Sequence, residues 1–172
     1  DDDDWEEDIR SSAIKEQIEY YLSGINLEKD KNLRNKIEES EDGSIPVDYF
    51  LNCNRLKYLD ATENEILENA ATSRYLKVDF DNKTIKSKEP FQHDPDRYKR
   101  IVRFRGIGKK VPRDVQFDFF NSTFGLEGRI EYVYLIRKEE NGNLVSTNET
   151  LVECDSVDLA NQVLENGISY RN

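Results

Sequence analysis

The spacing of hydrophobic residues changes along the chain, and this change limits the folds that it can adopt. Up to about residue 73, apolar residues recur every three or four positions, which is typical of amphipathic helices. From Tyr75 to Phe80 they alternate with polar residues, as in a strand with one buried face. A tight turn at Asp81 and Asn82 leads into a second such stretch, Lys83–Lys88. Helices followed by a hairpin predict a winged-helix domain.

The helices of this first part can be placed from their patterns. Residues 13–23 carry their apolar side chains on one stripe, and Gly24 follows where a helix commonly ends. The last helix has Thr62 and Glu65 at capping-box spacing. This last helix is expected over residues 62–73, and two others are expected over residues 28–40 and 48–52.

The second half of the chain alternates strand and helix patterns after a polar segment at residues 89–99. The expected order βαββαβ is that of a ferredoxin-like RNA-recognition motif (RRM). The sequence therefore predicts an α+β fold, with an acidic tail and winged helix at residues 1–88, a linker at 89–99 and an RRM-like domain at 100–172. The expected elements are strand 101–107, helix 114–124, strands 129–138 and 150–154, helix 156–166 and a short strand 168–170.

The charge of the chain limits how it could bind nucleic acid. It has 36 Asp and Glu against 25 Lys and Arg, a formal net charge of −11. Proteins that coat nucleic acid without selection neutralise phosphates with an excess of basic residues, so this class is disfavoured. A pocket that reads a few nucleotides remains compatible with the charge. The acidic run at residues 1–8 is expected to be a solvated, mobile tail, with Trp5 as the one feature that suggests docking.

Metal, cofactor and catalytic sites find little support in the sequence. Cys53 and Cys154 lie about a hundred residues apart, and His93 is the single histidine. A structural zinc site needs four ligands at short spacing, so we expect no metal, no cofactor and no enzymatic activity. No apolar run reaches membrane-spanning length. We therefore expect an intracellular protein with no membrane association.

The residues best suited to ligand binding lie in three short stretches, 17–23, 26–31 and 53–56. The adjacent Tyr20 and Tyr21 offer rings on which unpaired bases could stack, and the amide of Gln17 could read a base edge. An ionised Asp30 can only accept hydrogen bonds, so it would favour a ribose end with free hydroxyls over one that bears a phosphate. From the residues alone, the alternative that these tyrosines and Asp30 only pack and cap helices stays open.

The order of these motifs resembles the La motif. Gln-x-x-Tyr-Tyr, Asn-Leu-x-x-Asp-Lys, Ile-Pro and Asn-Arg-Leu follow one another over residues 13–88. In La and La-related proteins this motif precedes an RRM and binds the uridine-rich 3′ ends of RNA polymerase III transcripts. The resemblance implies a pocket for the last two nucleotides, with Asp30 at the terminal ribose. Its residues would be Gln17, Tyr20, Tyr21 and Asp30, supported by Asn54 and Arg55.

Some positions depart from the family pattern. Asn32 and Cys53 stand where the family usually has aromatic residues, so weaker oligouridine binding is expected. In the second domain, Arg103, Glu149 and Leu151 stand where an RNA-reading RRM presents aromatics. A basic run nevertheless extends over residues 97–113, and Arg103 and Arg105 would share one face of a strand. They could follow an RNA backbone or form a solvated face.

The resemblance implies a nuclear RNA-binding protein that is a La-related subunit of one ribonucleoprotein, such as telomerase or a small nuclear ribonucleoprotein. Its partners would be the single-stranded 3′ end of a noncoding RNA, which it protects while assisting assembly, and other protein subunits of the particle. The alternative is a protein-interaction scaffold whose RNA contacts are degenerate. The net charge, Asn32, Cys53 and the bare RRM sheet favour that alternative.

Overall fold

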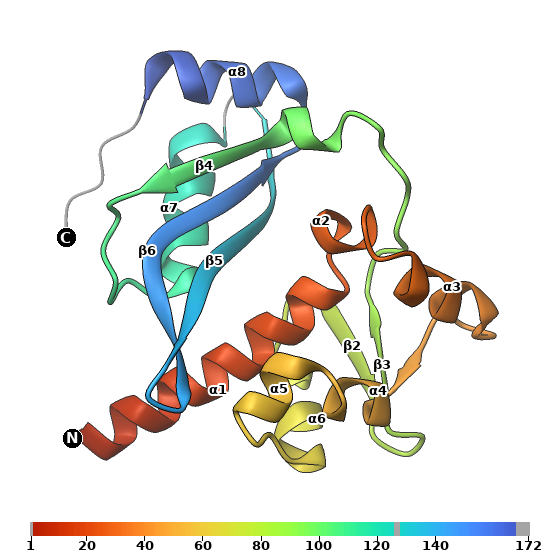
Figure 1. Cartoon of the computed structure of the whole chain (residues 1–172). Coiled ribbons are helices and arrows are strands. Elements are labelled where there is room, and N and C mark those ends of the chain that lie inside the picture. Colours follow the sequence, from red (N-terminus) through yellow and green to blue (C-terminus); the bar gives the residue numbers. More distant parts are fainter. Residues whose placement is uncertain (1, 126–127, 168–172) are drawn as a thin grey trace. The chain divides into compact units, whose positions relative to one another are not determined.

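The computed structural model describes residues 2–125 and 128–167 and has the predicted α+β fold. The chain divides into two compact units (Figure 1). The first contains the residues up to Asp94 together with Glu139–Val145. The second contains Pro95–Lys138 and the residues from Ser146 onward.

The first unit combines helices with a small antiparallel sheet, as predicted for a winged helix. The sheet has the order β1-β3-β2, and in the β2–β3 hairpin Val78 lies opposite Ile85. The strands are β1 (Ile45–Pro46), β2 (Leu76–Asp79) and β3 (Thr84–Ser87). The helices are α1 (Asp2–Tyr21), α2 (Gly24–Leu27), α3 (Lys31–Glu39), α4 (Val47–Leu51), α5 (Asn54–Tyr58) and α6 (Glu63–Ala71).

Apolar side chains from these helices and from the hairpin form one core. Burying such side chains is the main favourable contribution to folding. The core residues with no or almost no exposed area include Ile14, Ile18, Phe50, Leu56, Ile66 and Ile85. The core therefore joins α1, α4, α5 and α6 to the hairpin and fixes the helix ends around which the candidate site is built.

Two expectations about the first helix are wrong. It begins at Asp2 rather than near residue 13, so residues 2–8 are helical and do not form the expected tail. Gly24 does not end the helix either. It is the first residue of α2, because the Ser23 side chain accepts a hydrogen bond from the backbone N–H of Asn26 and so caps a new helix.

An ion pair attaches α1 to the start of α6. Arg10 Nε lies 2.9 Å from Glu65 Oε2, and the guanidinium also donates to the carbonyls of Leu59 and Asp60. Glu65 completes the predicted capping box, which is confirmed. Its side chain accepts from the N–H of Thr62 at 3.1 Å, and Thr62 Oγ1 accepts from the N–H of Glu65 at 3.2 Å.

The second expected helix begins at a later residue than the sequence pattern indicated, and Asp30 is its N-cap. The helix expected over residues 28–40 is α3, which begins at Lys31. The Asp30 side chain accepts a hydrogen bond from the N–H of Leu33 and acts as the N-cap. The short helix α5, which starts right after Cys53, was not predicted.

The second unit has the strand and helix order expected for an RRM-like domain. Its sheet has the order β4-β6-β5, so the first strand lies beside the third, and β4 and β6 are antiparallel. The predicted last strand, residues 168–170, lies outside the described residues. The elements are the 3₁₀ helix η1 (Arg97–Arg100), β4 (Ile101–Arg105), α7 (Arg113–Phe124), β5 (Ile130–Glu140), β6 (Asn143–Cys154) and α8 (Val157–Asn166).

Two sets of contacts hold this unit together. Phe120 of α7 is fully buried, and its ring centroid lies 4.7 Å from that of Phe104 in β4. Glu153 of β6 is also buried, and its carboxylate binds Arg97 at 2.7 Å and Arg100 at 3.0 Å. Two residues of the predicted basic run thus serve the fold.

Candidate nucleic-acid interface

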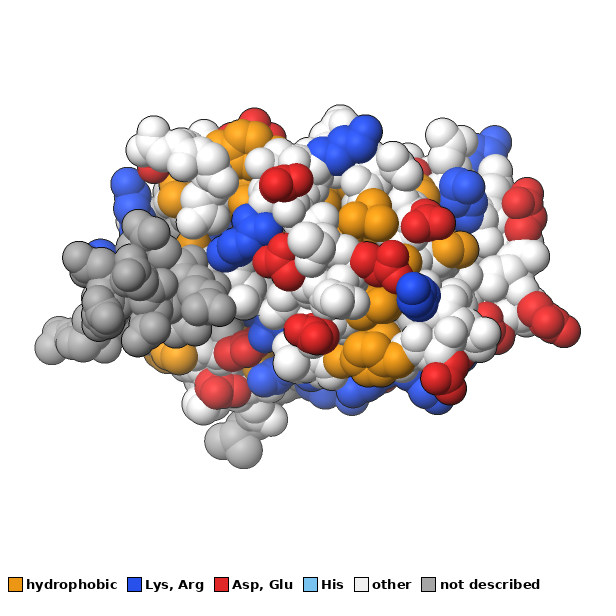
Figure 2. All heavy atoms as spheres, turned by 90° about the horizontal axis from the view of Figure 1, so that it is seen from below, with side chains coloured by type: hydrophobic (Ala, Val, Ile, Leu, Met, Phe, Trp, Pro, Cys, Tyr) orange, Lys and Arg blue, Asp and Glu red, His pale blue; other side chains and the backbone are white. Residues whose placement is uncertain are grey.

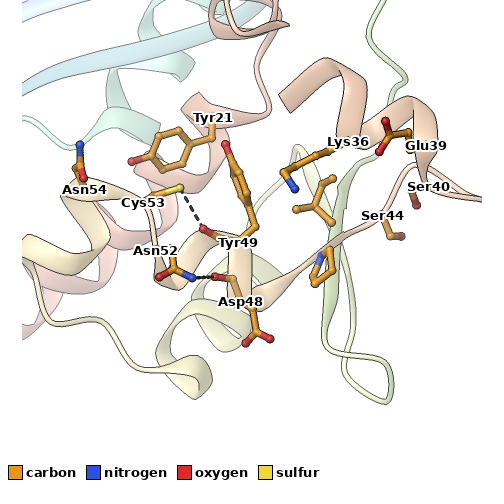
Figure 3. Close-up of a pocket in the computed structure, with 12 residues that line it drawn as sticks. Tyr21, Lys36, Glu39, Ser40, Ser44, Asp48, Tyr49, Asn52, Cys53 and Asn54 are labelled. Atoms are coloured by element: carbon orange, nitrogen blue, oxygen red, sulfur yellow. Dashed lines mark hydrogen bonds between the residues drawn. The ribbon is translucent and has the colours of Figure 1, made fainter. Parts of the chain in front are cut away.

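An open pocket of about 930 Å³ lies in the first unit (Figure 3). It is built from the last residue of α1, the end of α3, the segment that leads into β1, and the helices α4 and α5. Two tyrosines, a cysteine and several hydrogen-bonding side chains line it. The lining residues are Tyr21, Lys36, Glu39, Ser40, Ser44, Ile45, Pro46, Asp48, Tyr49, Asn52, Cys53 and Asn54.

Tyr21 is held in place by contacts on several sides. Its hydroxyl hydrogen-bonds with the side chains of Gln17 and Cys53 and with the backbone of Arg55, and burial raises its pKa well above the ordinary value. Its ring centroid lies 6.4 Å from that of Phe50. Gln17 is only 6% exposed and does not line the pocket. Gln17 and Arg55 therefore position Tyr21 in this structure.

Tyr49 is the second aromatic residue of the pocket, and the sequence analysis missed it. Its ring meets Phe50 edge to face, with centroids 5.3 Å apart. Lys36 Nζ lies 5.9 Å from the ring centroid. Figure 3 shows the ring of Tyr49 between Cys53 and Lys36. The sequence places adjacent Tyr49 and Phe50 after Ile45-Pro46, but the pattern alone does not tell which ring is buried.

Cys53 lies beside both tyrosines and hydrogen-bonds with their side chains. It is the N-cap residue of α5, and its Sγ donates to the carbonyl oxygen of Tyr49 at 3.4 Å. Burial raises the pKa of the Cys53 thiol to about 11. Burial, Cys53 and the charge of Asp30 likewise raise the pKa of Tyr49 to about 12. Both groups are therefore neutral at physiological pH, and the single proton of the Cys53 thiol is donated to the Tyr49 carbonyl.

Asp30 does not line the pocket, but its charge acts on two residues that do. One carboxylate oxygen accepts from the N–H of Leu33 at 3.1 Å. The other lies 3.5 Å from the amide nitrogen of Asn26, which donates to the carbonyl of Tyr21 at 2.8 Å. The negative charge of Asp30 contributes to the raised pKa values of Tyr49 and Cys53. Asp30 thus caps α3, and its negative charge disfavours ionisation of Tyr49 and Cys53 in the pocket.

The remaining predicted residues have different places. Asn54 is exposed and lines the pocket at the start of α5. Tyr20 is half-buried, with its ring 6.4 Å from Tyr21, and Lys29 Nζ lies 5.6 Å from its centroid. The structure therefore gathers Tyr21 and Asn54 in the pocket, with Gln17 and Arg55 in contact with Tyr21. It leaves Tyr20 outside the lining.

The basic strand of the second unit is compensated by an acid. Arg103 and Arg105 both form ion pairs with Glu149 on the neighbouring strand, at 2.8 Å for Arg105. The hydrogen bond from Arg103, followed by the charges of both arginines, lowers the pKa of Glu149. On the face shown in Figure 2, Lys and Arg side chains are likewise interspersed with Asp and Glu. Paired arginines attract phosphates less strongly than free ones.

Neither a metal cluster nor a membrane span is present in the described part of the chain. Among residues 2–125 and 128–167, no group of three or more His, Cys, Asp and Glu side chains could hold a metal ion. Over the same residues, no helix combines the length and the apolar character needed to cross a bilayer.

Comparisons with known proteins agree on one family. The family described as the La domain matches residues 14–72. The chain is 26% identical to La-related protein 7 of Mus musculus over 131 residues, which are 76% of this chain and 22% of that protein. An alignment of 180 positions to La-related protein 6A of Arabidopsis thaliana is 26% identical and covers 96% of this chain and 41% of that protein.

A further relative and one solved structure complete the comparison. Over 109 residues, 60% of this chain and 28% of that protein, the identity to the La protein homolog of Drosophila melanogaster is 30%. The solved La autoantigen N-terminal domain is 22% identical, with a TM-score of 0.45, over 48% of this chain and 89% of that domain. The chain spans about a fifth to two fifths of the length of these curated relatives.

Proposed function

Because this chain belongs to the La and La-related protein family, with a La domain at residues 14–72, we propose that it binds the uridine-rich 3′ end of a noncoding RNA. By holding that end it protects the RNA and assists the assembly of a ribonucleoprotein. The observation that carries the proposal is the pocket in which Tyr21, Cys53 and Asn54 meet beside the charge of Asp30.

The chemistry of the pocket fits an unpaired RNA end. Tyrosine rings provide stacking surfaces that suit unpaired bases, and each stacked base contributes about 1–3 kcal/mol. The amide of Asn54 is exposed and can both donate to and accept from a base edge. A duplex would bury the base faces that such a pocket uses. Single-stranded RNA is therefore the ligand that these side chains favour.

Asp30 gives the proposal its end specificity. Its Oδ1 accepts from the N–H of Leu33, whereas among residues 2–125 and 128–167 the nearest hydrogen-bond donor to its Oδ2 is the amide of Asn26, at 3.5 Å. An ionised carboxylate oxygen accepts hydrogen bonds from ribose hydroxyls and repels a phosphate. An RNA that ends in free 2′ and 3′ hydroxyls is thus favoured over one that ends in a 3′ phosphate.

A titration of the whole chain with two matched RNAs tests this function. A short oligouridine with 3′ hydroxyls and the same oligouridine with a 3′ phosphate are titrated by fluorescence anisotropy at one salt concentration. We expect the hydroxyl form to bind at least about tenfold more tightly, since a hydrogen bond to a charged group contributes about 1.5–3 kcal/mol. Equal affinity for the two RNAs would refute 3′-end recognition.

A second candidate function rests on the arginine–carboxylate cluster of the RRM-like sheet. Arg103 and Arg105 share the single carboxylate of Glu149, so this face offers an RNA backbone less positive charge than the sequence alone suggests. It suits a protein-interaction scaffold, in which the sheet docks on another subunit of the particle. Double charge reversal, Arg103→Glu with Arg105→Glu, distinguishes the two. A drop in RNA affinity that grows at low salt supports backbone contacts, and unchanged RNA affinity favours the scaffold.

The cellular setting is part of the same proposal. We place the protein in the nucleus, as a non-enzymatic La-related subunit of one ribonucleoprotein such as telomerase or a small nuclear ribonucleoprotein. We further propose that residues 1–88 act as the RNA-end module, 89–99 as a linker and 100–172 as the RRM-like module. Sequencing of the RNA crosslinked to the protein in cells tests this setting. One dominant noncoding RNA is expected, whereas many unrelated transcripts would contradict it.

A further inference from the structure

The two tyrosines that line the pocket differ in how they are held. The hydroxyl of Tyr21 is engaged by Gln17, Cys53 and the backbone of Arg55, whereas the side chain of Tyr49 hydrogen-bonds with that of Cys53. Tyr49 projects from the short helix α4, and its edge-to-face contact with Phe50, at an interplanar angle of 86°, sets the plane of its ring. Its side chain is only half-buried. Tyr49 is therefore the ring that is fixed in orientation and still open to a ligand.

The two sides of the Tyr49 ring have different neighbours. On one side Lys36, an exposed residue near the end of α3, brings its ammonium group to 5.9 Å from the ring centroid. On the other side lies Cys53, as Figure 3 shows. Cys53 hydrogen-bonds with the Tyr49 side chain, but it is small, and both residues border the open pocket. A flat ligand can therefore approach Tyr49 from the Cys53 side while a cation stays on the Lys36 side.

We propose that Tyr49 and Lys36 form a nucleotide subsite, in which an RNA base stacks on the Cys53 side of the Tyr49 ring and Lys36 faces the backbone phosphate of that strand. This inference rests on the proposed function and names the residues that carry it. Stacking on an aromatic ring tolerates any base, whereas a lysine acts on a phosphate as a point charge. The subsite thus adds affinity without adding a requirement for one base.

Three single variants of the full chain test the subsite, with two single variants as controls. Tyr49→Leu keeps apolar packing on Phe50 but removes the flat ring, and Tyr49→Phe keeps the ring and removes the hydroxyl. Phe80→Leu is the matched control for aromatic loss, because Phe80 is 54% exposed in the same unit and does not line the pocket. Lys36→Gln removes the cation. Its control is Lys77→Gln, an exposed lysine on β2 that is not part of the lining.

Each variant is titrated with oligouridine bearing 3′ hydroxyls and with its 3′-phosphate form, at several salt concentrations. We expect Tyr49→Leu to weaken binding of both RNAs at least about fivefold, and Tyr49→Phe and Phe80→Leu to stay within about twofold. Lys36→Gln should reduce the slope of log affinity against log salt by about 0.7, as for one lost phosphate contact to a single strand. Lys77→Gln should leave this slope unchanged.

The outcomes separate the subsite from the proposed function. If the wild-type chain prefers the 3′-hydroxyl RNA and Tyr49→Leu and Lys36→Gln bind like wild type, the subsite is refuted and 3′-end binding stands. If the wild-type chain shows no such preference, the proposed function fails and the subsite falls with it. Thermal melts followed by circular dichroism show whether each variant is folded. If Tyr49→Leu is destabilised, the salt dependence of RNA binding by Lys36→Gln decides the test.

Discussion

Replacing Asp30 by asparagine and by alanine separates its part in folding from the part proposed for it in RNA binding. Asparagine can cap α3 through its side-chain oxygen about as well as aspartate, because both accept the N–H of Leu33. It carries no charge, and it presents an NH₂ group where the second carboxylate oxygen was. Alanine removes both the cap and the charge.

The expected magnitudes follow from these contacts. Asp30→Ala should lower the free energy of unfolding by about 1 kcal/mol, the usual effect of losing an N-cap. Asp30→Asn should change it by less than about 0.5 kcal/mol. Both variants should reduce the preference for 3′-hydroxyl over 3′-phosphate RNA by about tenfold or more, because a charge-assisted hydrogen bond and a charge repulsion are lost together. Part of the change should appear as tighter binding of the phosphorylated RNA.

Two measurements on each variant decide the matter. Urea unfolding, followed by circular dichroism, gives the free energy of unfolding, and anisotropy titrations give the affinities for the two RNAs. Asp79→Asn is the control, since Asp79 is an exposed carboxylate at the end of β2 that accepts from Asn82, outside the pocket lining. If Asp30→Asn retains the full wild-type preference, the carboxylate does not contact the RNA end. If it is as unstable as Asp30→Ala, the capping argument is wrong.

Three further predictions concern the ion pairs. Glu153→Gln removes the negative charge that the largely buried Arg97 and Arg100 share, and it should cost about 3 kcal/mol in urea unfolding. This value is near the low end for a broken buried pair, because Arg100 also donates to a backbone carbonyl, and a change under 1 kcal/mol would contradict it. The hydrogen bond from Arg10 lowers the pKa of Glu65, so the pair stabilises the fold above the unfolded pKa of about 4.3, and this stabilisation is lost as pH falls through the lower folded pKa. Glu65→Gln should therefore make the free energy of unfolding fall less steeply at acid pH. An unchanged fall would argue against a contribution from this pair. If Arg103 and Arg105 face the RNA backbone, Glu149→Gln should raise the affinity for RNA at low salt. Equal affinities of Glu149→Gln and the wild-type chain across a salt titration would favour the protein-interaction scaffold.

The elements that could be predicted from the sequence are those set by local rules. The change from helical to alternating hydrophobic spacing predicted the β2–β3 hairpin, whose strands lie within the two expected stretches. The capping box at Thr62 and Glu65 depends on residues three apart, and it was found as expected. Gly24 misled the prediction, because the Ser23 cap competes with the usual role of glycine and starts α2 instead.

The contents of the pocket could be predicted only in part, because they depend on tertiary contacts. Tyr21 and Asn54 belong to recognisable motifs and do line it. Tyr49 and Lys36 come from different helices, and only packing against Phe50 decides which aromatic of α4 is buried and which one reaches the pocket. The neutralisation of Arg103 by Glu149 depends on strand register, which places residues 46 positions apart on neighbouring strands.

The raised pKa of Cys53 bears on how the pocket tolerates oxidants. Oxidation and disulfide exchange require the thiolate, and with a pKa of about 11 roughly one in ten thousand Cys53 thiols is ionised at neutral pH. At the ordinary thiol pKa of 9.0 the ionised fraction would be about a hundred times larger, and a charged or bulky oxidation product would fill the space beside Tyr49. The burial that keeps Cys53 protonated therefore slows its oxidation, which would otherwise change the shape of the pocket.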